Sequence, residues 1–142
     1  MKEIFPGVFK ISGKLVTRNA TPGKRVYGEK LLRYNGVEYR VWDPHRSKLA
    51  AALLNGLKYW SIDKNTNILY LGASSGTTIS HLTDITSGFV YGVEMSHRMM
   101  RELLPLSEVR NTIIPILADA SFPHRYCHLV GKIEVILSLI HI

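Results

Sequence analysis

The sequence predicts an α/β protein in which a small antiparallel β-hairpin domain precedes an incomplete Rossmann-like domain of about four parallel strands. Two observations support this fold class. The first forty-odd residues contain strand-like runs around Asn35-Gly36, the dipeptide most typical of a tight hairpin. From Asn67 onward, apolar runs alternate with helical segments, which indicates a parallel sheet with right-handed crossovers. We therefore expect an N-terminal β domain at residues 1–45 and the larger domain at residues 46–142.

The N-terminal β domain is predicted from alternation and turn residues. Apolar and polar positions alternate in VFKISGKLVTR, residues 8–18, as in half-buried strands. KLLRYNGVEYRVW, residues 30–42, forms two strand-like runs around the Asn-Gly turn. Pro44 follows and is expected to close the β region.

The larger domain is predicted to begin with a helix. Ser47 can cap this helix, which runs to about Asn55 and stops at Gly56. Strands are then expected in NILYLG, FVYGVE, TIIPILAD and KIEVIL, and helices in GTTISHLTDIT, in SHRMMRELL up to Pro105, and in the short stretch PHRYCHLV.

Residues suited to an adenosine-containing ligand follow three successive strands, at the strand ends where parallel sheets bind ligands. Gly72 and Gly76 bracket a tight turn into a helix, whose free N–H groups suit a negative group. Glu94 follows Gly72 by about 20 residues, the usual spacing for an acid that accepts both ribose hydroxyls. After the third strand, the carboxylate of Asp119-Ala120 can accept from an adenine amino group.

Ser74 indicates which adenosine ligand is expected. A dinucleotide fingerprint needs a glycine at this position, because its middle glycine makes room for the pyrophosphate. S-adenosylmethionine has no pyrophosphate and needs less space at the turn. The sequence therefore favours S-adenosylmethionine over NAD, and an NAD-linked oxidoreductase is the weaker hypothesis.

The net charge of +7 is unevenly distributed. Residues 1–48 contain eleven Lys or Arg against four Asp or Glu, whereas residues 49–142 contain seven of each. This asymmetry favours an anionic partner such as nucleic acid, although a merely soluble surface stays open as the alternative.

Cysteine content and hydropathy limit the cellular compartments in which the protein is expected. The single cysteine, Cys127, indicates a reducing, cytoplasmic compartment, and no apolar run is long enough for a membrane span, so no membrane partner is expected. His124, Cys127 and His128 lie at helical spacing, but no fourth ligand matches them, so no metal site is expected.

Four motifs resemble the fibrillarin family in its archaeal form: YRVWDPHRSKLAAALLNGL, LYLGASSGTTISHLTDI, VYGVEMSHR and NTIIPILADASFPHRY. The resemblance extends through about Ile136. It implies a Rossmann-like class I S-adenosylmethionine-dependent methyltransferase fold and an RNA 2′-O-methyltransferase acting on rRNA and tRNA. The implied partners are a box C/D guide RNA, a Nop-type scaffold protein and a kink-turn-binding protein.

The resemblance also implies roles for individual residues. The turn beneath the methionine part of the cofactor is formed by Gly72 and Ala73 and closed by Gly76. The residues expected to line the cofactor are Thr77, Thr78, Glu94, Met95, Asp119 and Ala120.

Lys48 is the one catalytic residue that the resemblance implies. A ribose 2′-hydroxyl is a weakly acidic nucleophile, so the site must orient it and help to remove its proton. The wider group of 2′-O-methyltransferases uses a Lys–Asp–Lys set, and Lys48 matches its first lysine. The alternative is a solvated lysine in the first turn of a helix.

The other two members of that set have no match in the sequence. Leu139 stands where the Asp is expected after the fourth strand, and the second lysine belongs to a later strand. The chain as given is therefore expected to be an inefficient enzyme. A non-catalytic RNA- or scaffold-binding subunit of the same ribonucleoprotein is the alternative.

The segment LSLIHI, residues 137–142, corresponds to one reading frame of the end sequence of a transposon-derived sequencing adapter. We expect it to be a non-native tail, with KIEVI as the genuine fourth strand.

Overall fold

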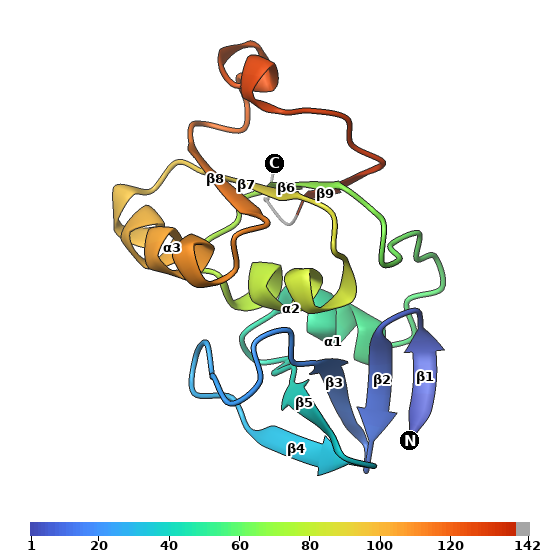
Figure 1. The fold of residues 1–142 in the computed structure, drawn as a ribbon. Helices are drawn as coiled ribbons and strands as arrows, with labels where there is room; N and C mark the ends of the chain where they lie inside the picture. Colours follow the sequence, from blue (N-terminus) through green and yellow to red (C-terminus); the bar gives the residue numbers. More distant parts are fainter. Residues whose placement is uncertain (139–142) are drawn as a thin grey trace.

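The structure, a computed structural model, describes residues 1–138 and contains two β-sheets with helices between them (Figure 1). The first sheet is antiparallel, with the strand order β1-β2-β3-β5-β4. Its strands are β1 (Lys2–Phe5), β2 (Val8–Ile11), β3 (Lys14–Arg18), β4 (Leu31–Tyr34) and β5 (Val37–Val41).

Two tight turns with positive φ set the register of this sheet. Asn35 and Gly36 have φ of 50° and 78° and join β4 to β5, so that Tyr34 pairs with Val37. The hairpin predicted at this dipeptide is confirmed. Ser12-Gly13 makes an equivalent turn between β2 and β3, within the segment that the sequence predicted only as alternating β structure.

The second sheet is parallel, with the strand order β8-β7-β6-β9. Its strands are β6 (Ile68–Leu71), β7 (Val90–Glu94), β8 (Ile113–Leu117) and β9 (Val135–Ser138). The helices are α1 (Lys48–Leu54), α2 (Thr77–Ile85) and α3 (His97–Val109), followed by two 3₁₀ turns, Pro123–Arg125 and Cys127–Leu129. The predicted alternation of strands and helices is confirmed.

The last strand extends into the segment expected to be a non-native tail. β9 includes Leu137 and Ser138, which pair with Tyr70 and Leu71 of β6. The remainder of that segment, residues 139–142, lies outside the described residues.

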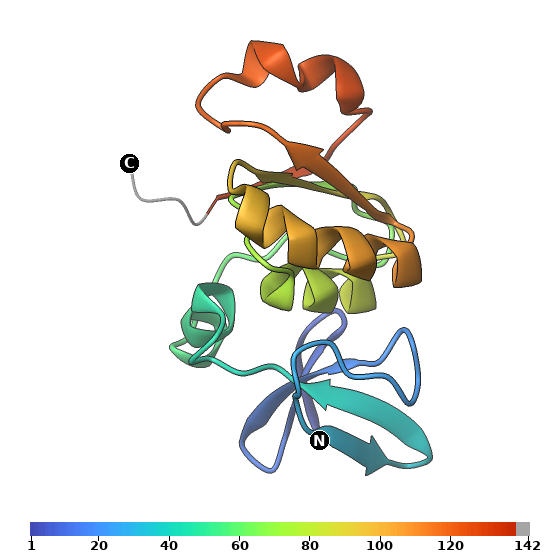
Figure 2. The ribbon, with the colours of Figure 1, turned by 90° about the vertical axis from the view of Figure 1, so that its left-hand side faces the viewer.

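The elements form stacked layers, which Figure 2 shows from the side. Helices α2 and α3 cover one face of the parallel sheet, and the N-terminal sheet lies beyond α2. The main apolar core runs through all these layers, joining Leu15 of β3 and Trp42 to Leu82 of α2 and Val90 of β7. The segment after β8 covers the other face, where Tyr126 is buried against the sheet.

The predicted start of α1 and the predicted end of α3 can be compared with the structure. Ser47 caps α1 as expected, because its hydroxyl accepts from the N–H of Ala50. The end predicted for α3 at Pro105 is wrong, since the helix continues to Val109. Pro105 lies on the exposed side, so the carbonyl that loses its helical partner can be solvated, while Leu103 and Leu106 on the other side pack in the core.

The side chain of Asp84 in α2 is fully buried at the junction of the two sheets. It forms ion pairs with Arg40 of β5 at 2.8 Å and with Arg110 at the end of α3 at 2.6 Å, and no part of its side chain is exposed. It also accepts hydrogen bonds from the Thr17 hydroxyl and the Ala20 N–H. Its carboxylate is therefore satisfied on both oxygens by three different parts of the chain.

A second buried acid completes the charge balance. Glu29 pairs with Arg40 at 2.6 Å and accepts from the N–H groups of Val26 and Tyr27. Burial alone would raise the pKa of Glu29, but these hydrogen bonds and the Arg40 charge outweigh it, so its pKa is lowered. The two arginines and two acids thus neutralise one another inside the protein.

His81 extends this network toward the surface. Its Nδ1 lies 2.7 Å from the Thr17 hydroxyl, its Nε2 lies 2.7 Å from the Tyr27 hydroxyl, and its ring stacks on Trp42. The Thr17 hydroxyl donates its proton to Asp84, and the Tyr27 hydroxyl donates to the Val41 carbonyl at 3.0 Å. Burial raises the pKa of Tyr27 to about 12, which keeps this hydroxyl a donor.

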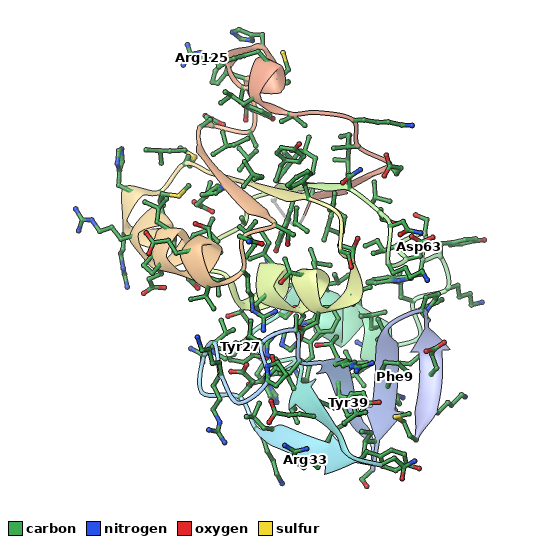
Figure 3. The ribbon with its side chains drawn as sticks, viewed as in Figure 1. Phe9, Tyr27, Arg33, Tyr39, Asp63 and Arg125 are labelled. Atoms are coloured by element: carbon green, nitrogen blue, oxygen red, sulfur yellow. The ribbon has the colours of Figure 1, made fainter. Side chains whose placement is uncertain are left out.

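Asp84→Asn is expected to lower the free energy of unfolding by about 3–5 kcal/mol, because it leaves two buried arginines without their shared anion. Urea denaturation measures this loss. Asp63→Asn, at the exposed Asp63 labelled in Figure 3, is the matched control and should cost much less. Equal losses in the two variants would contradict the central role of Asp84.

Stability is expected to decrease as the pH falls below about 6.5, and His81 is responsible. Burial first, and then the charges of Arg40 and Arg110, hold the pKa of His81 well below its usual value. The unfolded chain therefore binds the proton first, so the contribution of His81 is complete above the unfolded pKa and is lost below it. Urea denaturation between pH 8 and pH 5 should show a smaller pH dependence in His81→Gln, and an unchanged one in His45→Gln at an exposed site.

Candidate functional site

A tight turn connects β6 to α2 and folds over the end of β7. The N–H groups of Gly72 and Ala73 both donate to the carbonyl of Val93, at 2.8 and 3.0 Å. Gly72 and Ser74 have φ of 81° and 57°. Gly76, with φ of 117°, begins α2 in a conformation that suits glycine. These backbone constraints define the turn at residues 72–76.

Glu94 holds this turn from the end of β7. Its Oε1 accepts from the Ser74 N–H at 2.7 Å, and its Oε2 accepts from the Ser96 N–H at 2.9 Å. Sequence reasoning assigned Glu94 only to ligand hydroxyls and did not predict these backbone bonds. A carboxylate oxygen accepts more than one hydrogen bond, so Glu94 can fix the turn and still accept from a ligand.

A cavity of about 250 Å³ lies between the start of α1 and this turn, and we call it the turn cavity. The Ser47 and Thr78 hydroxyls, 2.8 Å apart, join its two sides. Of the residues selected from the sequence, the turn cavity is lined by Lys48, Gly72, Ala73, Thr77 and Thr78. The structure thus brings the expected catalytic lysine to the expected cofactor turn.

The turn cavity is suited to a negatively charged group. Gly76 has no side chain to cap α2, so the first N–H groups of this nine-residue helix receive no side-chain cap. The positive end of the helix and the Thr77 hydroxyl lie at the cavity. Burial raises the pKa of Tyr70, which keeps its hydroxyl protonated beside Thr78. This donor set fits the carboxylate of an amino-acid ligand.

The remaining selected residues lie along the same sheet edge but do not line the turn cavity. Met95 follows Glu94 and is 63% exposed. Asp119 follows β8 and accepts from the Ser121 N–H at 2.9 Å, while the Ala120 carbonyl accepts from the Tyr126 hydroxyl at 2.9 Å. Because β8, β7 and β6 are neighbours, these residues continue the edge in the order expected for an extended ligand.

Sequence reasoning missed three residues that also line the turn cavity: Arg46, Tyr70 and Ser75. Tyr70 could have been identified from the sequence, because it places a hydroxyl in an otherwise apolar strand just before the glycine turn. No sequence pattern identifies Arg46 or Ser75 as a cavity residue, because their position depends on how α1 packs against α2.

Within residues 1–138, no three His, Cys, Asp or Glu side chains are grouped to bind a metal ion. None of the helices in these residues has the length and apolar character needed to cross a membrane.

Comparison with known proteins identifies the relatives of this chain. The model of the fibrillarin family matches residues 1–141, beyond Ile136, the residue to which the sequence resemblance was expected to extend. The chain is 51% identical to the fibrillarin-like rRNA/tRNA 2′-O-methyltransferase of Pyrococcus furiosus, over 95% of its own length and 63% of that relative. It therefore spans less than two thirds of this relative.

Solved structures show the same fold. Aeropyrum pernix fibrillarin in complex with natively bound S-adenosyl-L-methionine is similar with a TM-score of 0.84 and 50% identity, over 88% of this chain and 55% of that one. A fibrillarin/Nop5p complex is similar with a TM-score of 0.85 and 43% identity, over 96% and 63%. The predicted Rossmann-like methyltransferase fold with its N-terminal β region is confirmed.

Gly76→Ala is expected to destabilise the protein more than Gly13→Ala. Positive φ costs either variant about 1–2 kcal/mol. Only at Gly76 would the new Cβ meet another side chain, at 2.6 Å from Leu106 Cδ2, and such overpacking adds about 1–3 kcal/mol. Urea denaturation compares the two variants, and equal losses would show that Leu106 moves aside without cost.

Proposed function

Because the chain belongs to the fibrillarin family, we propose that it carries the cofactor half of an S-adenosylmethionine-dependent RNA 2′-O-methyltransferase that acts on rRNA and tRNA. The observation that carries this proposal is the turn at residues 72–76, held by Glu94 and opening into a cavity with Lys48. The activity of the P. furiosus relative and the ligand of A. pernix fibrillarin support it.

The proposed cofactor residues are those of the sheet edge. When bound, S-adenosylmethionine supplies the methyl group on its sulfonium. The N–H groups at the start of α2, with Thr77 and Thr78, would hold its carboxylate, and Gly72 and Ala73 would let the methionine part approach the backbone. Glu94 would accept from the ribose hydroxyls with its remaining lone pairs.

The base of the cofactor would lie further along this edge. Asp119 would accept from the adenine amino group, and Ala120 and Met95 would contact the ring. The exposed side chain of Met95 can close over a flat ligand, because methionine is flexible and adapts to aromatic surfaces.

Lys48 is proposed to orient the target 2′-hydroxyl and to help remove its proton. It begins α1 at the wall of the turn cavity, opposite the turn that would hold the methionine part. This position suits an in-line approach of the hydroxyl to the methyl group. In the sequence of this chain, Lys48 is the only matched member of the Lys–Asp–Lys set.

The proposed setting is a cytoplasmic ribonucleoprotein. Box C/D guide RNA would select the target, and a Nop-type scaffold protein and a kink-turn-binding protein would be the protein partners. The solved fibrillarin/Nop5p complex supports the scaffold, and the single Cys127 supports a reducing compartment.

S-adenosylmethionine is expected to bind the 142-residue chain in a calorimetric titration, and NAD is not. Glu94→Gln should weaken this binding about tenfold, because it removes the charge of the proposed ribose acceptor. Glu108→Gln, at an exposed position of α3, is the matched control and should bind as tightly as the unmodified chain. Binding of NAD alone would overturn the choice of cofactor.

A methyl-transfer assay separates the enzyme from the non-catalytic alternative, which Leu139 at the expected Asp position favours. The chain is incubated with labelled S-adenosylmethionine and RNA in the assembled ribonucleoprotein. Slow transfer that Lys48→Gln abolishes supports the enzyme. Cofactor binding with no transfer in either variant supports the subunit that binds without chemistry.

A further inference from the structure

A second and larger cavity, of about 630 Å³, adjoins the turn cavity. It lies between the loop at residues 21–27, the start of α2 and one side of α3, and Tyr27 in Figure 3 marks its N-terminal wall. We call it the basic groove, after the exposed cations that line it: Lys24, Arg25, Arg46 and Arg101. The function proposed above does not use it.

The exposed cations of the basic groove form no ion pair within residues 1–138. The ion pairs in this part of the chain involve Arg40, Arg110 and His81. Arg110 also lines the groove, but Asp84 balances its charge. Among the described residues that line the groove, Glu102 is the only acid. The groove therefore offers a net positive surface to an anionic partner.

Two of the arginines are held in place before any ligand arrives. The Nε of Arg25 donates to the Glu29 carbonyl at 2.9 Å. One terminal nitrogen of Arg46 donates to the Tyr27 carbonyl at 2.9 Å, and its guanidinium lies 5.4 Å from the centre of the Tyr27 ring. Guanidinium groups that are already ordered lose less entropy on binding an anion, and their free N–H groups match phosphate oxygens.

The groove is continuous with the turn cavity. Arg46, Ser75 and Thr77 line both. Arg46 also directly precedes the Ser47-Lys48 pair that begins α1. An anion in the groove thus lies next to the lysine proposed to act on a ribose.

The dispersed cations favour a polymer over a small anion. Four cations spread over 630 Å³ match several phosphates better than a single one. RNA carries one phosphate for each ribose, so a strand whose ribose enters the turn cavity must place its neighbouring phosphates nearby.

We propose that the basic groove binds the backbone phosphates of the RNA strand next to the target ribose, with Arg46 contacting the phosphate nearest to it. This inference rests on the proposed function for the identity of the ribose. The groove does not read bases, since its cations contact phosphate and carry no sequence preference.

The test uses a fluorescein-labelled 12-nucleotide oligouridylate, whose binding to the chain is followed by anisotropy at several salt concentrations. The groove variant combines Lys24→Gln, Arg25→Gln and Arg101→Gln. Removing three phosphate contacts should reduce the slope of log affinity against log salt by about 2, and the affinity at low salt by tenfold or more. The single variants Lys24→Gln and Arg101→Gln, whose side chains form no hydrogen bond within residues 1–138, should each show part of the loss.

The matched control removes the same charge elsewhere, at three exposed lysines: Lys58→Gln, Lys64→Gln and Lys132→Gln. It should retain both affinity and slope. Equal losses in the groove and control variants would show diffuse attraction and overturn the proposal, as would unchanged RNA binding in the groove variant. If the groove variant instead loses binding only to a poly-glutamate peptide, the partner is an acidic protein and the RNA assignment falls.

Titration with S-adenosylmethionine keeps the two proposals distinguishable. The groove variant should bind the cofactor as the unmodified chain does, because none of its three substituted residues lines the turn cavity. If the chain binds RNA through the groove but binds no cofactor, the proposed methyltransferase function is refuted and the proposed phosphate binding by the groove is retained. Cofactor binding without groove-dependent RNA binding would refute the groove alone.

Discussion

The buried carboxylate of Asp84 is the constraint on which the arrangement of this protein depends. It is the shared anion of Arg40 from the N-terminal sheet and Arg110 from the end of α3. A buried cation without its partner is far more costly than an exposed one, so these elements are stable only when they meet at Asp84. Apolar packing of Trp42 and Leu82 across the same junction supplies the non-directional part of the stability.

The same network determines where the functional surfaces lie. Asp84 and His81 fix α2, and α2 begins directly after the turn at residues 72–76. On the other side, His81 orients Tyr27, whose carbonyl and ring hold Arg46 between the turn cavity and the basic groove. The N-terminal sheet is therefore part of the wall of the site, since one chain of hydrogen bonds connects its strands to both cavities.

Local rules made much of this predictable from the sequence. The Asn35-Gly36 hairpin, the Ser47 cap and the glycine turn after β6 depend on the conformational preferences of adjacent residues, so each was identified from a short segment. Asp84 was not, because its two arginine partners lie 44 and 26 residues away and its own helix gives no sign of burial. The helix end predicted at Pro105 was wrong for the same reason. Packing of the neighbouring leucines outweighs the local preference of proline to end a helix.

The fold determines where the excess positive charge of the sequence lies on the surface. Of the basic residues in the first 48, Arg40 is neutralised in the core and contributes nothing to the surface field. Lys24, Arg25 and Arg46 instead face α3, which adds Arg101 from residues 49–142, the part of the sequence with no net charge. Composition alone therefore placed the positive surface in one part of the sequence, whereas packing builds it from both, beside the cavity that contains Lys48. A polyanion attracted to the groove is thereby brought to the proposed site of chemistry.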